Sequence, residues 1–366
     1  MKKMDWQKLL FPGRRLKELG ILGMNMRNGD YILPHNQRKN FPLVDNKLLT
    51  KKLAENFGIA VPRLYGVIEI EHQIAELASL LQPHQDFVIK PAHGSGGEGI
   101  LIISGRSNRH YRKLNGEIVT VSALGHHISN ILSGMYSLGG LPDKALIEYR
   151  IGFDPVFENI SHQGVPDIRT IVFRGVPVMS MVRLPTRLSD GKANLHQGAI
   201  GVGIDLRTGR TTNGVWHEDL IDTHPDTGNV INDLQIPYWQ DVLRYSALCQ
   251  EMVGLDYIGV DMVLDSRLGP LMLEINARPG VSIQLANKKG LLTGLHKIAA
   301  LQTIPDSAQQ RVALAQGIHD SVAPFQTHGH EKSRIAPKKD NGGGVKDFLD
   351  DAKGGQALAF RMKKAS

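Results

Sequence analysis

The chain has 366 residues, with 41% apolar and 22% charged side chains, as in an ordinary globular protein with room for two or three hydrophobic cores. A single cysteine, Cys249, excludes an internal disulfide and a cysteine-based metal cluster, and indicates a reducing, cytoplasmic setting. The net charge is +7, but residues 331–366 carry nine basic and five acidic side chains and so contribute +4 of it. The basicity therefore gives no reason to expect a nucleic-acid surface on the folded body, and no segment predicts a signal peptide or a membrane span.

A helix is predicted early in the chain, after a basic stretch, residues 1–40, that Gly and Pro interrupt. Asp45 or Asn46 can cap this helix, apolar residues follow at helical spacing, and Gly58 stands where it should end. The next predicted elements are a helix at 72–81, a strand, glycine loop and strand at 86–104, a helix at 126–136 and a strand at 145–151.

Two long hairpins dominate the second half. The first covers 167–185 and turns near Arg174 and Gly175, and the second covers 257–280. Helices are predicted at 241–255 and 291–302, and little fixed structure is expected from about residue 328. Hairpins segregated from helices indicate the α+β class, with antiparallel sheets backed by helices.

The second hairpin has a register that can be predicted. With the turn centred on residues 266–269, Asp265 opposes Pro270 and Asp261 opposes Glu274. Directly opposed side chains lie about 5 Å apart, so the two carboxylates repel each other unless a partner intervenes.

Asn276 lies on the same strand face as Glu274, because side chains alternate along a strand. Two carboxylates and a carboxamide are oxygen ligands of the kind that Mg²⁺ takes together with substrate phosphates. The pattern predicts a divalent cation held by Asp261, Glu274 and Asn276. The alternative is a pair of acids on a solvated surface, which the flanking apolar residues disfavour.

A glycine-rich loop follows the strand that carries Lys90. Another strand comes directly after this loop, whereas a dinucleotide-binding loop or a P-loop opens a helix. We therefore predict a flap at the tip of a hairpin, with backbone N–H groups and Lys90 directed at phosphates; an ordinary glycine-rich turn is the alternative. The glycines of the loop are Gly94, Gly96, Gly97 and Gly99.

Two arginines accompany the first long hairpin. Arg169 shares a strand face with Asp167, and Arg183 lies on the return strand. One guanidinium group can bind two phosphoryl oxygens at once, so both arginines are candidates for phosphate binding. The alternative is that they form ion pairs with acidic side chains on neighbouring strands. A polar loop at 191–203 follows, and for His196 a structural role is as plausible as a binding one.

Taken in order, these motifs resemble the ATP-grasp superfamily, and most nearly the RimK-type α-L-glutamate ligases. The resemblance covers roughly residues 41–290 and implies two α+β lobes whose antiparallel sheets grip ATP. The matching motifs are DNKLLT, VIKPAHGSGGEGI, IEYR, DIRTIV, ANLHQGA, GVDMVLD and LEINARPG.

The resemblance also implies roles for single residues. Asp261, Glu274 and Asn276 would hold two Mg²⁺ or Mn²⁺ ions. The implied ATP-binding residues are Lys47, Lys90, Gly94, Ser95, Gly96, Gly97, Glu148, Tyr149, Asp167, Lys192, Ala193 and Asn194. The candidates for contact with the transferred phosphoryl group are Arg169, Arg183 and Arg278, with His196 as a possible acceptor-binding residue.

The family reaction activates a carboxylate as an acyl phosphate, which an amine attacks to form an amide. We therefore expect an ATP- and Mg²⁺-dependent ligase that adds glutamate or another amino acid to an unidentified acceptor. A kinase, which would stop at phosphorylation, and a non-catalytic nucleotide-binding subunit are the alternatives.

The chain departs from RimK-type ligases at its amino terminus, since residues 1–40 are too short for the α/β domain that those enzymes carry there. Residues 105–145 look longer than a simple connection and are expected to be an insert, and either this insert or a protein partner completes the acceptor site. The predicted divisions are the segment 1–40, an amino-terminal lobe 41–150, a carboxy-terminal lobe 151–305 with the metal site, and a basic, largely flexible tail 306–366 that can bind an acidic surface.

Overall fold

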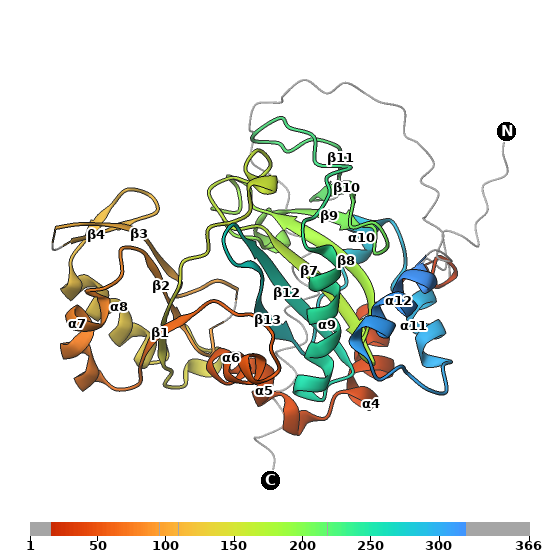
Figure 1. The fold of residues 1–366 in the computed structure, drawn as a ribbon, viewed down its shortest axis with the longest axis horizontal. Helices are drawn as coiled ribbons and strands as arrows, with labels where there is room; N and C mark the ends of the chain where they lie inside the picture. The colour runs from red at the N-terminus through yellow and green to blue at the C-terminus, as the bar shows by residue number, and fades with distance from the viewer. Residues whose placement is uncertain (1–15, 95, 109, 218, 320–366) are drawn as a thin grey trace, which may run out of the picture. The chain divides into compact units, whose positions relative to one another are not determined.

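Two antiparallel sheets organise the computed structural model, which describes residues 16–319 apart from positions 95, 109 and 218. One sheet has six strands in the order β1-β6-β2-β3-β4-β5, and the other has seven in the order β11-β10-β9-β8-β7-β12-β13 (Figure 1). Every strand pairing within them is antiparallel, so the predicted α+β class is confirmed.

Helices cover both faces of the first sheet. On one face, Phe87 and Ile89 pack with Leu124 and Ile128 of α8, and on the other, Leu146 packs with the helix α6. The strands are β1 Leu64–Ile68, β2 Phe87–Pro91, β3 Leu101–Ser107, β4 His110–Lys113, β5 Ile118–Val119 and β6 Ala145–Glu148. The helices are α6 Lys47–Asn56, the 3₁₀ helix η3 Glu71–Glu76, α7 Leu77–Leu81, α8 Val121–Leu132 and the 3₁₀ helix η4 Leu138–Gly140.

Helix α6 confirms the predicted cap, because Asn46 Oδ1 accepts a hydrogen bond from the backbone N–H of Leu49 at 3.0 Å. Gly58 follows the helix in the left-handed region, with φ +66°, as a helix end favours. The boundary predicted for the next long helix was wrong: α8 begins at Val121, where Thr120 supplies the cap, instead of at residue 126.

Residues 105–145, the predicted insert, are an integral part of the first sheet. They contain the end of β3, then β4, β5 and α8, and Tyr111 and Ile128 are buried in the same core as Phe87. Removing them would take away core side chains of this lobe.

The second sheet carries an apolar core on one face and a mixed surface on the other. Helix α9 covers the first face, where Leu243 packs with Val182 and Ile258. The strands are β7 Asp167–Phe173, β8 Val176–Leu184, β9 Ile200–Ile204, β10 Thr211–Trp216, β11 Asp219–Ile221, β12 Tyr257–Asp265 and β13 Gly269–Asn276. The helices are η5 Pro155–Phe157, η6 Leu195–Gln197, α9 Trp239–Val253, α10 Ile283–Asn287, α11 Leu291–Ala299 and α12 Ala308–His319.

The opposite face of the second sheet changes character along its strands. At one end, Phe173 and Tyr257 pack with Leu295 of α11 in a second apolar cluster. At the other end, Arg169 and Asp167 lie four and six residues from Phe173 on the same face of β7, and Asp261 lies four residues from Tyr257 on the same face of β12. The candidate site lies at this charged end.

The described part of the amino-terminal segment belongs to this second core instead of forming a separate piece. Leu22 and Tyr31 are buried with α11, and Asn36 donates from Nδ2 to the carbonyl oxygens of Tyr257 at 2.7 Å and Ala277 at 3.0 Å. The helices here are α3 Met24–Met26, the π-helix η1 Arg27–Ile32, α4 Leu33–His35, η2 Arg38–Asn40 and α5 Pro42–Asp45.

The predicted tail begins too early, because helix α12 occupies Ala308–His319 and its Val312 is buried with the α9 core. The rest of the predicted tail, residues 320–366, lies outside the described residues.

Candidate functional site

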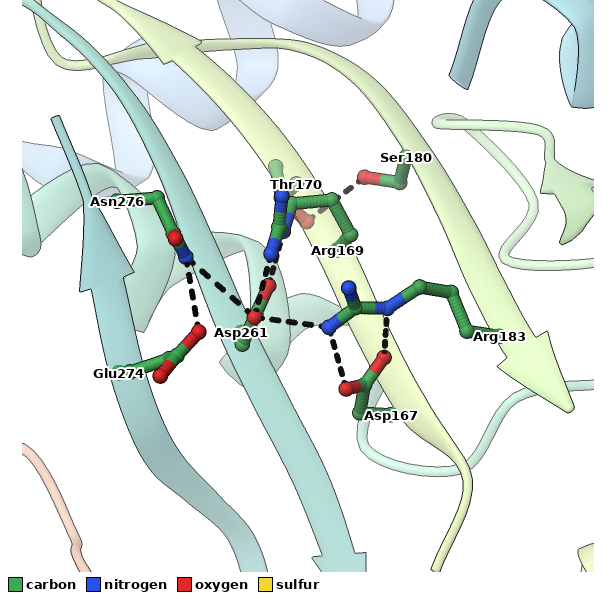
Figure 2. Close-up of polar contacts among 8 residues, drawn as sticks. All are labelled: Asp167, Arg169, Thr170, Ser180, Arg183, Asp261, Glu274 and Asn276. Atoms are coloured by element: carbon green, nitrogen blue, oxygen red, sulfur yellow. Dashed lines mark hydrogen bonds and ion pairs between the residues drawn. The ribbon is translucent and has the colours of Figure 1, made fainter. Parts of the chain in front are cut away.

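A network of ion pairs crosses four strands at the charged end of the second sheet (Figure 2). Arg169 donates from Nε and Nη2 to the two carboxylate oxygens of Asp261, with Nη2–Oδ2 at 2.6 Å. Arg183 donates in the same way to Asp167 and reaches Asp261 Oδ2 at 2.8 Å. Asn276 donates from Nδ2 to Glu274 Oε1 at 3.2 Å.

The strand register explains why these side chains meet. Asp167 opposes Arg183 on β8, Arg169 opposes Asp261 on β12, and Asp261 opposes Glu274 on β13. Directly opposed residues share a face, so all five project to the same side of the sheet.

The predicted pairing of Asp261 with Glu274 is confirmed, but the predicted pairing of Asp265 with Pro270 is wrong. Asp265 opposes Gly269 instead, one residue earlier. A β-bulge between the two positions leaves Leu273 without an opposing residue and restores the predicted register at Glu274. The bulge therefore sets which residues of β13 face Asp261.

Burial makes the charge balance of this network important. Asp261 is 1% exposed and Asp167 7%, and burial disfavours their ionised forms. Burial raises the pKa of Asp167, whereas Arg169 and Arg183 outweigh burial and hold the pKa of Asp261 below its usual range. Counting Glu274, three carboxylates meet two guanidiniums, so the ionised network carries one excess negative charge.

The donor set fits a hard cation that is completed by a nucleotide. Within the described residues, no three Asp, Glu, His or Cys side chains lie in positions to hold a metal together. Asp261 and Glu274 offer two carboxylates and Asn276 a carboxamide, so the remaining ligands would have to be phosphate oxygens or water. Mg²⁺ takes such mixed shells readily, whereas a metal that needs a full cage of protein ligands would not be satisfied here.

A second charged cluster lies on the first sheet, facing α6. Glu148 is 3% exposed and forms ion pairs with Lys90 of β2 and with Lys51 of α6, the latter at 2.8 Å. Burial opposes its charge, but the two ammonium groups hold the pKa of Glu148 below its usual range. Lys51 was missed by the sequence analysis, although it lies one helical turn after Lys47 and therefore on the same side of α6.

The glycine loop is the tip of a hairpin, as predicted, since β2 pairs directly with β3 on either side of it. Its base is tied to α6, because Lys47 donates from Nζ to the carbonyl oxygen of Gly94. Its tip approaches the second lobe, where a Cβ at Gly97 would lie 3.7 Å from Cδ of Lys192. The flap residue Ser95 lies outside the described residues.

Lys47 connects the two charged clusters. Burial lowers the pKa of its ammonium group, and the electrostatic influence of Glu274 on β13 opposes this shift. Lys90 and Glu148 act on the same ammonium group. The structure therefore brings Lys47, one of the predicted phosphate-binding lysines, within electrostatic range of the predicted metal ligand Glu274.

Several predicted ATP contacts are already occupied within the protein. The backbone N–H of Tyr149 donates to the carbonyl oxygen of Arg63 at 2.8 Å, so this group of a predicted ATP-binding residue already has a partner. Asn194 Oδ1 accepts from the backbone N–H of His196 at 3.0 Å and so caps a short 3₁₀ helix. Ala193 lies in the same half-buried loop, next to Lys192.

Arg278 does not join the network. Strand β13 ends at Asn276, and the Arg278 guanidinium is exposed, 4.8 Å from the centre of the Phe41 ring. Arg278 therefore does not continue the strand face of Glu274 and Asn276, because β13 ends at Asn276 and Pro279 follows.

A hollow of about 130 Å³ lies beside the network. Two of its lining residues, Leu195 and Ala286, lie 3.1 and 3.5 Å from the position of a Cβ at Gly201, the residue that opposes Arg183 on β9. The predicted acceptor residue His196 lines it as well. The full lining is Leu195, His196, Ala199, Val215, His217, Ser282, Leu285 and Ala286.

Comparison with known families gives the class of protein. The sequence matches the sugar-transfer associated ATP-grasp family over residues 26–300, which is most of the chain. The protein belongs to this family, and the two antiparallel sheets are those of an ATP-grasp fold.

Solved structures are similar to this chain at low sequence identity. The ATP-grasp ligase PsnB complexed with a minimal precursor is 14% identical, with a TM-score of 0.41 over 74% of this chain and 64% of that chain. The biotin carboxylase of Campylobacter jejuni is 14% identical, with a TM-score of 0.44 over 78% of this chain and 50% of that one. The D-alanine–D-alanine ligase of Bacillus anthracis, solved with ATP, is 13% identical, with a TM-score of 0.37 over 77% and 66%.

The chain thus spans about half to two thirds of the length of these proteins. A search among curated proteins finds no match. Among the residues that the structure describes, no helix has both the length and the hydropathy needed to cross a bilayer.

Proposed function

We propose that the protein is an ATP- and Mg²⁺-dependent carboxylate–amine ligase, which joins a carboxylate to an amine through an acyl phosphate. The observation that carries the proposal is the presence of two charged clusters with opposite net charge, one on each sheet. With its three carboxylates ionised, the network around Asp261 has one excess negative charge, and the cluster of Lys51, Lys90 and Glu148 has one excess positive charge. The first suits a cation and the second suits the phosphates that the cation accompanies.

The residues of the network have separate tasks in this reaction. Asp261, Glu274 and Asn276 would hold one or two Mg²⁺ ions, which neutralise charge on the migrating phosphoryl group. Arg169 and Arg183 use Nε and Nη2 for Asp261 and Asp167, and within the described residues Nη1 of each takes part in no hydrogen bond. These two Nη1 groups are the donors available to a substrate carboxylate and to the acyl phosphate.

In the proposed sequence, a carboxylate oxygen attacks the terminal phosphorus of ATP and the bond to ADP breaks. An amine then attacks the acyl carbon, phosphate leaves, and the nitrogen loses its proton. Lys47, Lys90 and the backbone of the flap, including Gly94, Gly96 and Gly97, would hold the phosphates during the first step. No nucleophilic side chain is required.

The hollow lined by His196 is the proposed place for the acceptor. It lies next to Gly201, one strand away from Arg183. Its lining combines apolar side chains such as Leu195 and Ala286 with two imidazole groups, which suits a small organic molecule with polar substituents. The family name supports acceptors from sugar chemistry, such as a sugar carboxylate or an amino sugar. Glutamate or another amino acid as the second substrate, and a cytoplasmic location, remain part of the proposal.

An ADP-release assay tests the proposal. The full chain is incubated with ATP, Mg²⁺, single amino acids and a panel of uronic acids and amino sugars, and products are analysed by mass spectrometry. An amide product supports the ligase. A stable phosphorylated product would instead indicate a kinase, and nucleotide binding without ADP release from any pair would indicate a non-catalytic subunit.

A further inference from the structure

The end of strand β13 carries a predicted metal ligand at the edge of the second sheet. Among the described strands, β13 pairs with β12 alone, and their last pair is Gly259 with Asn276. Asn276 Nδ2 donates to Glu274 Oε1 at 3.2 Å and lies 3.5 Å from Asp261 Oδ2 (Figure 2). The carboxamide that joins the two carboxylates therefore projects from the last rung of an edge strand, where a ladder opens most readily.

Asn36 of the amino-terminal segment takes the place of the next rung. Its Oδ1 accepts from the backbone N–H of Tyr257 at 2.9 Å, and its Nδ2 donates to the carbonyl oxygen of Tyr257 at 2.7 Å. A residue opposite Tyr257 in a hydrogen-bonded antiparallel pair would make both of these bonds. The same Nδ2 donates at 3.0 Å to the carbonyl oxygen of Ala277, which directly follows Asn276. One side chain thus joins the beginning of β12 to the residue after β13.

A second bond from the same segment holds the chain two residues further on. Arg27 donates from Nη1 to the carbonyl oxygen of Pro279 at 2.8 Å. A Cβ at Gly259 would lie 2.6 Å from Pro279 Cβ and 3.2 Å from Cδ of Arg169, so glycine is needed for this close approach. Pro279 and the stem of Arg169 therefore meet over Gly259, beside the ion pair of Arg169 with Asp261.

The two donors project from a part of the segment that is packed into the second core. Asn36 is 3% exposed and Arg27 is 6% exposed. Leu22 and Tyr31 of the same segment are buried in the cluster that contains Tyr257. Apolar packing thus anchors the segment, and the polar bonds to Ala277 and Pro279 extend from this fixed base to the chain that follows the metal ligands.

We propose that Asn36 is a positioning residue for the metal site, which fixes the backbone at Ala277 and thereby the direction of the Asn276 side chain. Arg27 supports the same stretch of chain at Pro279. The bonds of Asn36 go to backbone groups, so it acts through Asn276 and not on the metal directly. The inference rests on the proposed function only in taking Asp261, Glu274 and Asn276 as the metal ligands. The amino-terminal segment thereby becomes part of the site.

Electron paramagnetic resonance of the full chain with Mn²⁺ and ADP tests the inference without a substrate. The signal of free Mn²⁺ is lost on binding, so a titration measures the affinity for the metal. The wild type is compared with Asn36→Ala and with the matched control Asn40→Ala. Asn40 lies in the same segment, but its Nδ2 donates to the carbonyl oxygen of Gly254 at the end of α9, at 2.9 Å.

The Mn²⁺ affinity of Asn36→Ala should be weaker by roughly 10-fold, on the scale of losing an outer contact of a metal ligand. Its affinity for ADP in EDTA should equal that of the wild type, and Asn40→Ala should equal the wild type in both measurements. A loss of stability without a change of metal affinity is what a merely structural role would give. If circular dichroism shows that Asn36→Ala is unfolded, Arg27→Gln takes its place with the same expectation.

The outcomes separate the inference from the proposed function. Wild-type Mn²⁺ affinity in the folded variant of Asn36, or in Arg27→Gln where that variant replaces it, would overturn the positioning role and leave the metal site intact. An equal loss in Asn36→Ala and Asn40→Ala would overturn it as well, because the effect would then belong to the whole segment. A wild type that binds ADP but no Mn²⁺ would overturn the proposed metal site together with the inference.

Discussion

The two charged clusters differ in the basic side chains that pair with their buried carboxylates. In the second sheet, Asp261 is shared by two arginines, whereas in the first sheet Glu148 is shared by two lysines. Arg169 is bidentate to Asp261, and Arg183 is bidentate to Asp167 and reaches Asp261 through Nη2 alone. Both arginines come from neighbouring strands, so their geometry is fixed by the sheet. The lysine pairs join a strand to a helix through flexible stems, so Lys90 can leave Glu148 for a phosphate while Lys51 keeps the buried carboxylate paired. We infer that the Asp261 cluster of the second sheet is a rigid cluster and that the Glu148 cluster of the first sheet is an adjustable cluster.

The largest effect should follow from removing the centre of the rigid cluster. Asp261→Asn leaves Arg169 without its carboxylate partner and weakens Arg183, and loss of one member of a buried ion pair costs about 3–5 kcal/mol. Urea unfolding measures the free-energy change. A variant as stable as the wild type would contradict the inference that the Asp261 ion pairs form a rigid cluster that stabilises the fold.

Substitution of the predicted metal ligand Glu274 should change metal binding without changing the stability of the fold. Glu274→Gln leaves the arginine pairs intact, so the free energy of unfolding should change by less than about 1 kcal/mol. The strengthening of ADP binding by Mg²⁺ should fall at least ~10-fold, because one carboxylate ligand is lost. Calorimetry with and without EDTA makes the measurement, and a wild-type Mg²⁺ response would remove Glu274 from the metal site.

Matched methionine substitutions test the adjustable cluster. Lys90→Met should weaken ATP binding at least ~10-fold, since it removes a charge-assisted phosphate contact. Lys51→Met should act mainly on stability, by about 1–3 kcal/mol, because Glu148 then keeps a single partner. If the two variants have interchanged effects, Lys51 and not Lys90 is the phosphate ligand.

The pH dependence of stability reports on Glu148. Its folded-state pKa is lowered from the ordinary value of 4.5, so its ion pairs stabilise the fold above that pH. This contribution is lost as the pH falls through the lowered folded-state pKa. Urea unfolding between pH 3 and 7 should therefore show a steeper acid loss for the wild type than for Glu148→Gln; parallel curves would contradict the assignment.

The smallest effect is expected at Arg278, which lies outside both clusters. Arg278→Ala removes only the cation–π contact with Phe41, worth about 0.5–1 kcal/mol at an exposed site. Thermal unfolding and ADP binding measure the two properties. A large loss of nucleotide affinity would return Arg278 to the proposed site.

The sequence by itself determined the fold class, the two hairpins and the opposition of Asp261 and Glu274, because strand alternation and turn residues are local signals. Arg174 and Gly175, for example, lie at the predicted turn with φ of +49° and +75°, as a type I′ turn requires. Local signals also placed the glycine loop between two strands and the cap of α6 at Asn46.

Only the tertiary structure decided which charges are partners. The bulge at Leu273, the pairing of Lys51 with Glu148 and the contact between Asp143 and His93 each join residues whose proximity depends on how strands and helices pack. Asp143 is fifty residues from His93 in the chain, and no periodicity in the sequence connects them. Such pairs form because buried charges must find partners once the cores have assembled, and that requirement acts on the folded arrangement instead of on any single segment.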